Sequence, residues 1–198
     1  MNSPLVSIIV ISYNASKSIE ETLDSILSQT YSPLELIVAD DHSPDDTALI
    51  CKKWIEKHGD RFSKCLLIVN EENKGISANS NIAVRASSGE WIKIVGDDVL
   101  LPDAIENNLS FAIETNSEIV TSCATRFSDS TKEIINTVPG EDYQFPKTAK
   151  EQYIAHIKTK LKAPSPTWFY KRELYDKLGG YDEHFRSLDD MPLLLKML

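Results

Sequence analysis

The sequence predicts a single α/β domain with a mostly parallel central sheet flanked by helices, and with a small antiparallel element in its C-terminal half. Short β-rich runs alternate with amphipathic helical segments through residues 5–115. Strands that recur at this rhythm, each followed by a helix, indicate βαβ units and parallel pairing. A chain of 198 residues, 41% of them apolar, is also long enough to bury roughly 70% of the surface that its unfolded form exposes.

The first four strands and the first four helices alternate along the chain. Strands are predicted over residues 5–11, 34–39, 66–69 and 91–95 from their apolar and β-branched runs. The first helix is predicted after Asn14 or Ser16, which can cap it, with apolar residues at positions 19, 23, 26 and 27. The second helix follows Asp45 or Asp46 and stops at residue 59. The third covers 75–86, and the fourth extends from Pro102 through residue 113.

The pattern changes after Asn116. Two strands, over 119–127 and 133–138, are expected to pair antiparallel around a polar turn. A helix over 148–161, a loop at 163–166 and a short strand over 167–170 follow. The last residues, up to Leu198, have an apolar helical pattern without a terminating Gly. We therefore expect the chain to be truncated at its C-terminus.

Composition and charge exclude several classes of protein. The net charge of −9 argues against a nucleic-acid partner, because binding to phosphates needs a basic surface. No apolar run reaches the ~18 residues of a membrane span, and the N-terminus lacks the positive charge of a secretory signal. The three cysteines form no CxxC pair, which favours a reducing compartment. A cytoplasmic location is therefore expected.

Polar residues follow each of the first four predicted strands. They are Ser12-Tyr13-Asn14, Asp40-Asp41, Asn73-Lys74-Gly75 and Asp97-Asp98. Open α/β sheets bind their ligands at the carboxyl ends of the strands. Two carboxylate pairs at neighbouring strand ends repel each other unless a cation compensates them, and Mg²⁺ or Mn²⁺ prefers such oxygen ligands. The alternative is that these aspartates serve only turns and helix caps, a reading that either pair alone leaves open.

Five segments of the chain, in order, resemble glycosyltransferase family 2. They read VSIIVISYN, LELIVADDHSPDDT, NKGISANSNIAV, GEWIKIVGDDVLLPDAIE and LGGYDEHFRSLDDMPLLLKM. The resemblance implies the GT-A fold, with a Rossmann-like sheet, over residues 1–198 as one catalytic domain. Residues 1–115 would form its nucleotide-sugar-binding half, and residues 116–198 its acceptor side. It also implies an enzyme, a hexosyl- or N-acetylhexosaminyl-transferase that inverts the anomeric centre of its donor.

By this resemblance, individual residues take roles in the reaction. Asp41 matches the aspartate that hydrogen-bonds the uracil of a UDP-sugar, and Asp97 would approach the ribose. Asp98 would coordinate Mn²⁺ or Mg²⁺ between the phosphates, and Asp190 matches the general base, with Asp189 where Glu is usual. The remaining nucleotide-binding residues are expected to be Ile11, Ser12, Tyr13, Asn14, Asn73 and Gly75.

The sequence also departs from the family pattern. Val95 stands where many members carry the first aspartate of a longer acidic signature, so the metal site depends on Asp97 and Asp98. His42 replaces a common Gly. These departures bear on the donor and on the phosphate contacts more than on the fold.

The expected partners are a nucleotide-sugar donor and a glycan or lipid-linked sugar acceptor, in bacterial-type surface polysaccharide or glycan biosynthesis. A lipid-linked acceptor would bring the protein to the inner face of the membrane. An alternative is a catalytically impaired nucleotide-sugar or glycan-binding module, against which the four aspartates at positions 41, 97, 98 and 190 argue. Asp189 and Asp190 can also cap the following helix, because the helix dipole favours acids there.

Overall fold

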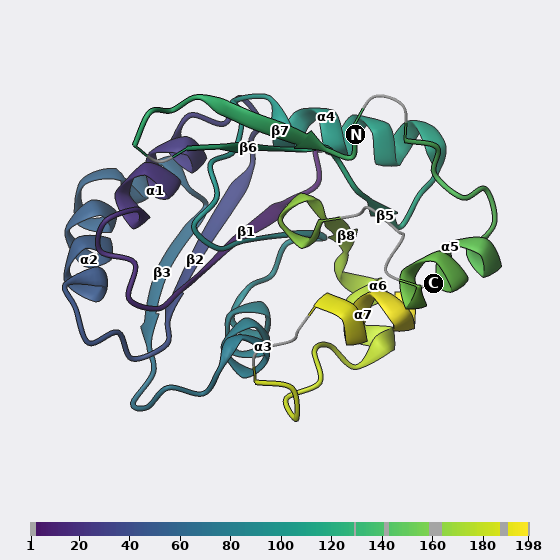
Figure 1. The fold of residues 1–198 in the computed structure, drawn as a ribbon. Helices are drawn as coiled ribbons and strands as arrows, with labels where there is room; N and C mark the ends of the chain where they lie inside the picture. Colours follow the sequence, from purple (N-terminus) through teal and green to yellow (C-terminus); the bar gives the residue numbers. More distant parts are fainter. Residues whose placement is uncertain (1–2, 129, 141–142, 159–163, 187–189, 198) are drawn as a thin grey trace.

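The computed structural model describes residues 3–128, 130–140, 143–158, 164–186 and 190–197. These residues form a six-stranded sheet in the order β3-β2-β1-β4-β8-β5 and a separate two-stranded sheet, β6-β7. Helices cover both faces of the larger sheet (Figure 1). The predicted α/β architecture, with a mostly parallel sheet and a small antiparallel element, is confirmed.

The parallel part of the sheet comes from the first half of the chain. Its strands are β1 (Val6–Ser12), β2 (Leu34–Asp40), β3 (Lys64–Val69) and β4 (Trp91–Val95), with β1 paired to β2 and β4. The helices between and after them are α1 (Ile19–Leu27), α2 (Thr47–His58), α3 (Ile76–Ala86) and α4 (Ala104–Thr115), with a short 3-10 helix at Gly59–Arg61. The four strands and α2, α3 and α4 lie within two residues of their predicted bounds. The predicted caps of α1 are wrong, because the helix begins at Ile19 after Ser18 and not after Asn14 or Ser16.

The core consists of two apolar layers, one on each face of the sheet. Alternate residues of β1 point to opposite faces: Ile8 packs with α1, α2 and α4, and Ile9 packs with α3, α6 and α7. Figure 1 shows α1 and α2 together on one side of the strands and α3, α6 and α7 on the other. Because both faces are covered, β1 and β2 are buried along nearly their whole length, as parallel strands usually are.

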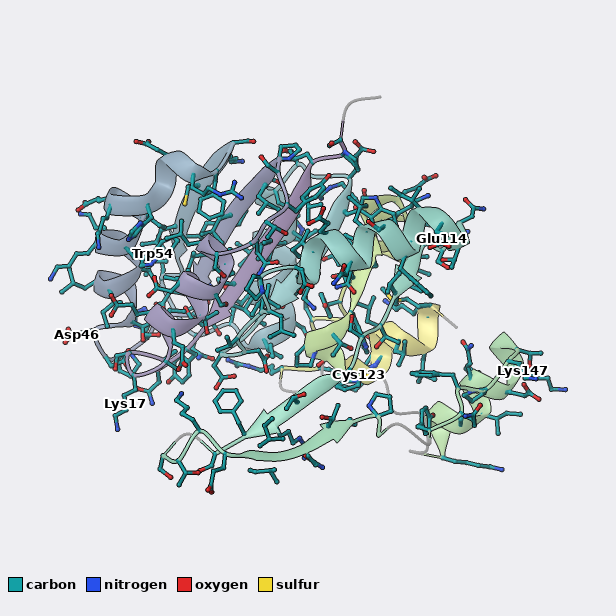
Figure 2. The ribbon with its side chains drawn as sticks, turned by 90° about the horizontal axis from the view of Figure 1, so that it is seen from above. Lys17, Asp46, Trp54, Glu114, Cys123 and Lys147 are labelled. Atoms are coloured by element: carbon teal, nitrogen blue, oxygen red, sulfur yellow. The ribbon has the colours of Figure 1, made fainter. Side chains whose placement is uncertain are left out.

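The predicted strand over 119–127 is wrong, because it is two strands in two sheets. β5 (Ile119–Val120) pairs antiparallel with β8 (Phe169–Lys171) at the edge of the main sheet, whereas β6 (Ala124–Phe127) pairs with β7 (Ile134–Val138). Val120 is buried against the main sheet, and the residues of β6 and β7 are mostly exposed. Figure 2 shows the β6–β7 pair as a separate layer beside the main sheet, beyond Cys123.

The remaining elements lie in the second half of the chain. They are α5 (Ala149–Ile157), a 3-10 helix at Ser165–Thr167, α6 (Arg172–Leu178) and α7 (Asp190–Met197). The sequence patterns did not predict α6, which ends at Gly179 and Gly180, both with positive φ (76° and 72°). A side chain at Gly180 would also lie 2.7 Å from the Tyr175 hydroxyl. None of the helices in the described part of the chain combines the length and the apolar character of a membrane span.

Glu35 is a buried carboxylate in β2 that ties three segments together. It accepts hydrogen bonds from the Ser7 hydroxyl (2.5 Å), the Ser88 amide and hydroxyl (3.0 Å for the hydroxyl), and the Gly89 amide (2.8 Å). Burial alone raises the pKa of Glu35, but these hydrogen bonds to the ionised form outweigh burial and hold it below its usual value.

We expect Glu35→Gln to lower the free energy of unfolding by about 1–3 kcal/mol at neutral pH, since it leaves buried donors without a charged acceptor. A carboxyl with a depressed pKa stabilises the fold above the unfolded pKa, and this contribution is lost as the pH falls through the folded pKa. The wild type should therefore lose more stability than the variant between pH 7 and acid. Urea denaturation at several pH values measures this, with the exposed Glu56→Gln in α2 as the control. Equal pH dependence in Glu35→Gln and the wild type would contradict it.

Candidate active site

A cavity of about 520 Å³ opens at the carboxyl ends of the parallel strands. All eight residues predicted to bind the nucleotide line it: Ile11, Ser12, Tyr13, Asn14, Asp41, Asn73, Gly75 and Asp97. They come from the last residues of β1 and from the segments after β1, β2, β3 and β4, which the parallel sheet brings to one edge. Six further residues complete the described lining: Ala15, Ser18, Ile76, Asn79, Gly96 and Arg186.

Asp40, the first residue of the acidic pair after β2, is a structural residue. Its carboxylate is fully buried and accepts hydrogen bonds from the Ser43 amide (2.9 Å) and hydroxyl (2.5 Å) and from the Ser12 hydroxyl (3.2 Å). The Ser43 hydroxyl in turn accepts the Asn14 amide at 2.9 Å. Asp40 thus fixes the segment after β1 to the segment after β2, and so shapes one wall of the cavity.

The starts of α1 and α2 are joined by a second set of hydrogen bonds. The Asp45 carboxylate accepts the Ser16 amide (3.0 Å) and the Thr47 hydroxyl (2.5 Å), and the Thr47 oxygen accepts the Ala15 amide (2.9 Å). These hydrogen bonds lower the pKa of Asp45. Figure 2 shows Lys17 and Asp46, which follow these contacts, at the same end of the molecule. The polar residues between β1 and α1 are therefore held in place before any ligand binds.

Asp41 holds the loop after β3 against the cavity. Its Oδ1 accepts the Asn70 side-chain amide (2.8 Å) and the Lys74 backbone amide (2.9 Å), and its Oδ2 accepts the Gly75 amide (2.8 Å). Each carboxylate oxygen has two acceptor positions. Oδ2 therefore keeps one acceptor position for a ligand. The residue is 4% exposed. The next residue, His42, has a φ of 62°, a left-handed conformation that explains why glycine is favoured there.

Asp97 and Asp98 follow β4 and differ in their surroundings. Asp97 is exposed on the cavity wall, and its carboxylate accepts no hydrogen bond from the described residues. Asp98 is partly buried, and its pKa is raised first by burial and then by the charge of Asp97, against the opposing charge of Lys93. Lys93 is buried inside β4, where burial lowers its pKa to about 8, and its ammonium donates to the Pro166 carbonyl.

The residues present fit a divalent cation that arrives with a phosphate ligand. Mg²⁺ and Mn²⁺ take oxygen ligands, and Mg²⁺ is commonly held by one or two carboxylates together with the phosphates of the substrate. The carboxylates of Asp97, on the cavity wall, and of Asp98, next to it in the chain and partly buried, match that requirement. Within the described residues no group of three or more His, Cys, Asp or Glu side chains could hold a metal ion, so the protein alone offers an incomplete set of ligands.

Asp190 is the first residue of α7, the position expected of an acid at a helix start. The structure describes its backbone but not the placement of its side chain, and Asp189 lies outside the described residues. The segment just before them reaches the cavity: the Ile76 amide donates to the Arg186 carbonyl at 3.0 Å, and Arg186 lines the cavity wall. The part of the chain that leads into α7 is thus packed against the loop that carries Gly75.

Sequence reasoning missed three polar residues of this cavity, Ser18, Asn79 and Arg186. Asn79 donates to the Ala39 carbonyl (2.9 Å) and accepts from the Asn70 side chain (3.0 Å), so it supports Asp41 through Asn70. Its place in α3, one turn after Gly75, was a usable signal, since a helix that starts at the cavity brings its first turn there. Arg186 had no such signal, because only the packing of distant segments brings it to the nucleotide-binding half.

Comparison with known proteins gives the family and the fold of the chain. The family model described as "Glycosyl transferase family 2" matches residues 7–179 of the chain. A relative from Escherichia coli, "UDP-Glc:alpha-D-GlcNAc-diphosphoundecaprenol beta-1,3-glucosyltransferase WfgD", is 34% identical over 117 residues, which are 59% of this chain and 44% of that protein. The chain spans between 14% and 55% of the length of the first curated relatives that it matches.

Two solved structures share the fold over nearly the whole chain. The mannosyltransferase PcManGT from Pyrobaculum calidifontis, in complex with GDP-Man and Mn²⁺, has a TM-score of 0.71 and 27% identity over 97% of this chain and 51% of that chain. TarS 1-349 from S. aureus, in complex with UDP-GlcNAc, has a TM-score of 0.71 and 21% identity over 96% of this chain and 52% of that chain. These structures show that the chain has the GT-A fold. Because the family model matches residues 7–179, the chain belongs to glycosyltransferase family 2.

Proposed function

We propose that the protein transfers a sugar from a UDP-sugar to an acceptor hydroxyl, with inversion at the anomeric carbon. The observation that carries the proposal is the cavity, where the segments after four parallel strands meet and where Asp41 and Asp97 both face the space. A relative named for UDP-Glc and a structural neighbour with bound UDP-GlcNAc support a uridine nucleotide, and the neighbour with GDP-Man shows that the fold also accepts guanosine.

The uracil ring fits the remaining hydrogen-bonding capacity of Asp41. Uracil presents one ring N–H, and Oδ2 of Asp41 keeps one acceptor position after it has accepted the Gly75 amide. Tyr13, which is 54% exposed at the cavity wall, offers an aromatic face beside it. Asp41 would then both hold the loop after β3 and select the base.

The diphosphate and the cation are assigned to the edge formed by Asp97 and Asp98. Asp98, with Asp97 beside it, would hold Mn²⁺ or Mg²⁺ against the phosphate oxygens. When bound, the ion supplies positive charge to the departing diphosphate. The protein's own contribution is to present two carboxylates just after β4 and to keep Asp98 partly shielded from water.

The reaction requires a base on the acceptor side, and Asp190 is assigned that role. The acceptor oxygen forms a new bond to the anomeric carbon as the bond from that carbon to the phosphate oxygen breaks. The acceptor proton passes to the Asp190 carboxylate, and UDP leaves with the electrons of the broken bond. Attack from the face opposite the leaving group gives inversion.

The acceptor side is assigned to residues 116–198 and the donor side to residues 1–115, within one domain. β5 and β8, from the second half, extend the same sheet as the donor-side strands, which fits one domain rather than two. The acceptor would be a glycan or a lipid-linked sugar of a bacterial-type surface polysaccharide, handled in the cytoplasm, and a lipid-linked acceptor would place the protein at the inner membrane face.

Calorimetric titration of the wild type with UDP, in Mn²⁺ and in EDTA, tests the proposed donor. We expect saturable binding that is at least several-fold tighter with Mn²⁺, because the ion offsets the repulsion between the diphosphate and the two aspartates. Equal affinity in both conditions would contradict the metal role. Tight metal-dependent binding without transfer to any acceptor by the full-length protein would favour the alternative, a nucleotide-sugar-binding module that has lost catalysis.

Asp41→Asn should weaken both the fold and the binding of UDP. The substitution replaces one acceptor oxygen by an amide that donates, next to the backbone amides of Lys74 and Gly75. We expect a loss of about 1–3 kcal/mol in the free energy of unfolding, the usual result of unpaired buried donors, and a lower affinity for UDP with Mn²⁺. Thermal melting and calorimetry measure the two effects. An unchanged melting temperature would mean that the three hydrogen bonds of Asp41 contribute nothing to stability.

A further inference from the structure

Arg186 brings a positive charge into the cavity from the C-terminal half of the chain. Among the described residues that line the cavity it is the only cationic side chain, and the same lining includes the acidic residues Asp41 and Asp97. Two lysines of the elements around the cavity, Lys74 and Lys93, contact other groups. The Lys74 ammonium pairs with Glu72 at 3.2 Å, and the Lys93 ammonium donates to the Pro166 carbonyl.

Two hydrogen bonds to main-chain carbonyls hold the segment of Arg186 in place, in addition to the contacts of its guanidinium. The Ile76 amide donates to the Arg186 carbonyl at 3.0 Å, and the Ser77 hydroxyl donates to the Phe185 carbonyl at 2.6 Å. Gly75 lies so close that an added Cβ would be 2.7 Å from the Arg186 carbonyl oxygen. The segment is therefore anchored to the start of α3 by its main chain, and its side chain is available for another role.

Among the described residues, the guanidinium donates hydrogen bonds only to neutral groups. Its Nη2 donates to the Asn73 carbonyl at 2.7 Å and to the Asn73 side-chain oxygen at 3.3 Å. No carboxylate of the described residues lies within 4.0 Å of it. A guanidinium has five N–H donors in a planar fork that matches phosphate oxygens. Arg186 thus keeps an uncompensated charge and unused donors on the cavity wall.

We propose that Arg186 binds the diphosphate of the nucleotide donor, a role that rests on the proposed function and adds a residue to it. The two carboxylates of Asp97 and Asp98 and the two negative charges of a nucleotide-sugar diphosphate outnumber the charge of one divalent cation. A second cation at the cavity wall reduces that imbalance. Arg186 also connects the bound donor to the segment that leads, four residues later, to Asp190.

The test compares UDP with uridine, which has the same base and ribose but no phosphate. Calorimetric titrations in Mn²⁺ use the wild type, Arg186→Gln and Arg186→Lys. Two further variants are controls for the anchoring of the same segment outside the cavity lining. Ser77→Ala removes the hydroxyl contact to Phe185 but keeps the Ile76 amide on the Arg186 carbonyl, so the segment stays anchored. Arg85→Gln removes an exposed arginine that pairs with Glu183 at 2.9 Å.

We expect Arg186→Gln to weaken UDP about tenfold or more, the usual effect of losing a hydrogen bond to a charged group, and to leave uridine unchanged. Arg186→Lys should recover part of the loss, and the two controls should bind UDP within about twofold of the wild type. The inference is overturned if Arg186→Gln binds UDP as the wild type does, if uridine is weakened equally, or if Ser77→Ala shows the same loss. A wild type that binds neither UDP nor GDP would instead refute the proposed function, and the inference with it.

Discussion

Asp190→Asn is expected to bind UDP with unchanged affinity while sugar transfer falls by ~10²–10⁴-fold, the usual contribution of a positioned base. Asparagine keeps the size of the side chain and much of its hydrogen bonding, but it cannot accept the acceptor's proton. Because the base acts on the acceptor, the loss should appear in kcat rather than in the affinity for the donor. Steady-state kinetics of the full-length protein, together with calorimetry of UDP, measure the two quantities.

Asp189→Asn is the matched control for this prediction, since it removes the same charge one residue earlier. Its effect should be smaller, because that residue would act only through its charge. Near wild-type transfer by Asp190→Asn together with an inactive Asp189→Asn would shift the base by one residue. Activity in both variants would show that the base lies elsewhere in the chain.

Asp98→Asn is expected to abolish the difference in UDP affinity between Mn²⁺ and EDTA and to reduce transfer by ~10²–10³-fold, the range seen when a group that stabilises developing charge is removed. The variant should not be less stable than the wild type, because burial and the charge of Asp97 make the ionised form of Asp98 unfavourable in the free protein. Calorimetry and thermal melting separate the two effects.

The control for Asp98 is Asp103→Asn, which removes an exposed carboxylate on the same connection between β4 and α4. It should keep both the Mn²⁺ dependence and the transfer rate. If Asp98→Asn retains its Mn²⁺ dependence, the metal is held by other residues. If Asp103→Asn also loses the Mn²⁺ dependence of UDP binding, the result for Asp98→Asn reflects the local negative charge rather than coordination of the metal by Asp98.

The parallel half of the fold could be predicted because its signals are local. Each strand is an apolar run that ends in polar residues, each helix has an apolar face, and the connections are short, so periodicity alone places them. The residues that line the cavity follow from the same rule, since parallel strands all end at one edge of the sheet. This is why all eight expected nucleotide-binding residues meet in one cavity.

The second half depends on contacts that periodicity does not report. Residues 119–127 read as one strand, but Val120 pairs with Phe169, about fifty positions later, and the chain then leaves the sheet for the β6–β7 pair. Arg186 reaches the cavity because the Ile76 amide and the Ser77 hydroxyl donate to carbonyls of its segment and fix it to α3. Likewise, the sequence pattern does not distinguish Asp40 from Asp41. In the structure, Asp40 accepts hydrogen bonds from Ser43 in the loop after β2, whereas Asp41 lines the cavity.

The most direct test of the central claim, that this cavity binds the nucleotide of a sugar donor, is a crystal structure of the protein with UDP and Mn²⁺. The account predicts the uracil beside Tyr13 with its ring N–H on the Asp41 carboxylate, and the diphosphate between Asp97–Asp98 and Arg186. UDP bound away from Asp41, for example in the second cavity, of about 590 Å³, lined by Glu90, Lys171 and Lys177, would contradict it.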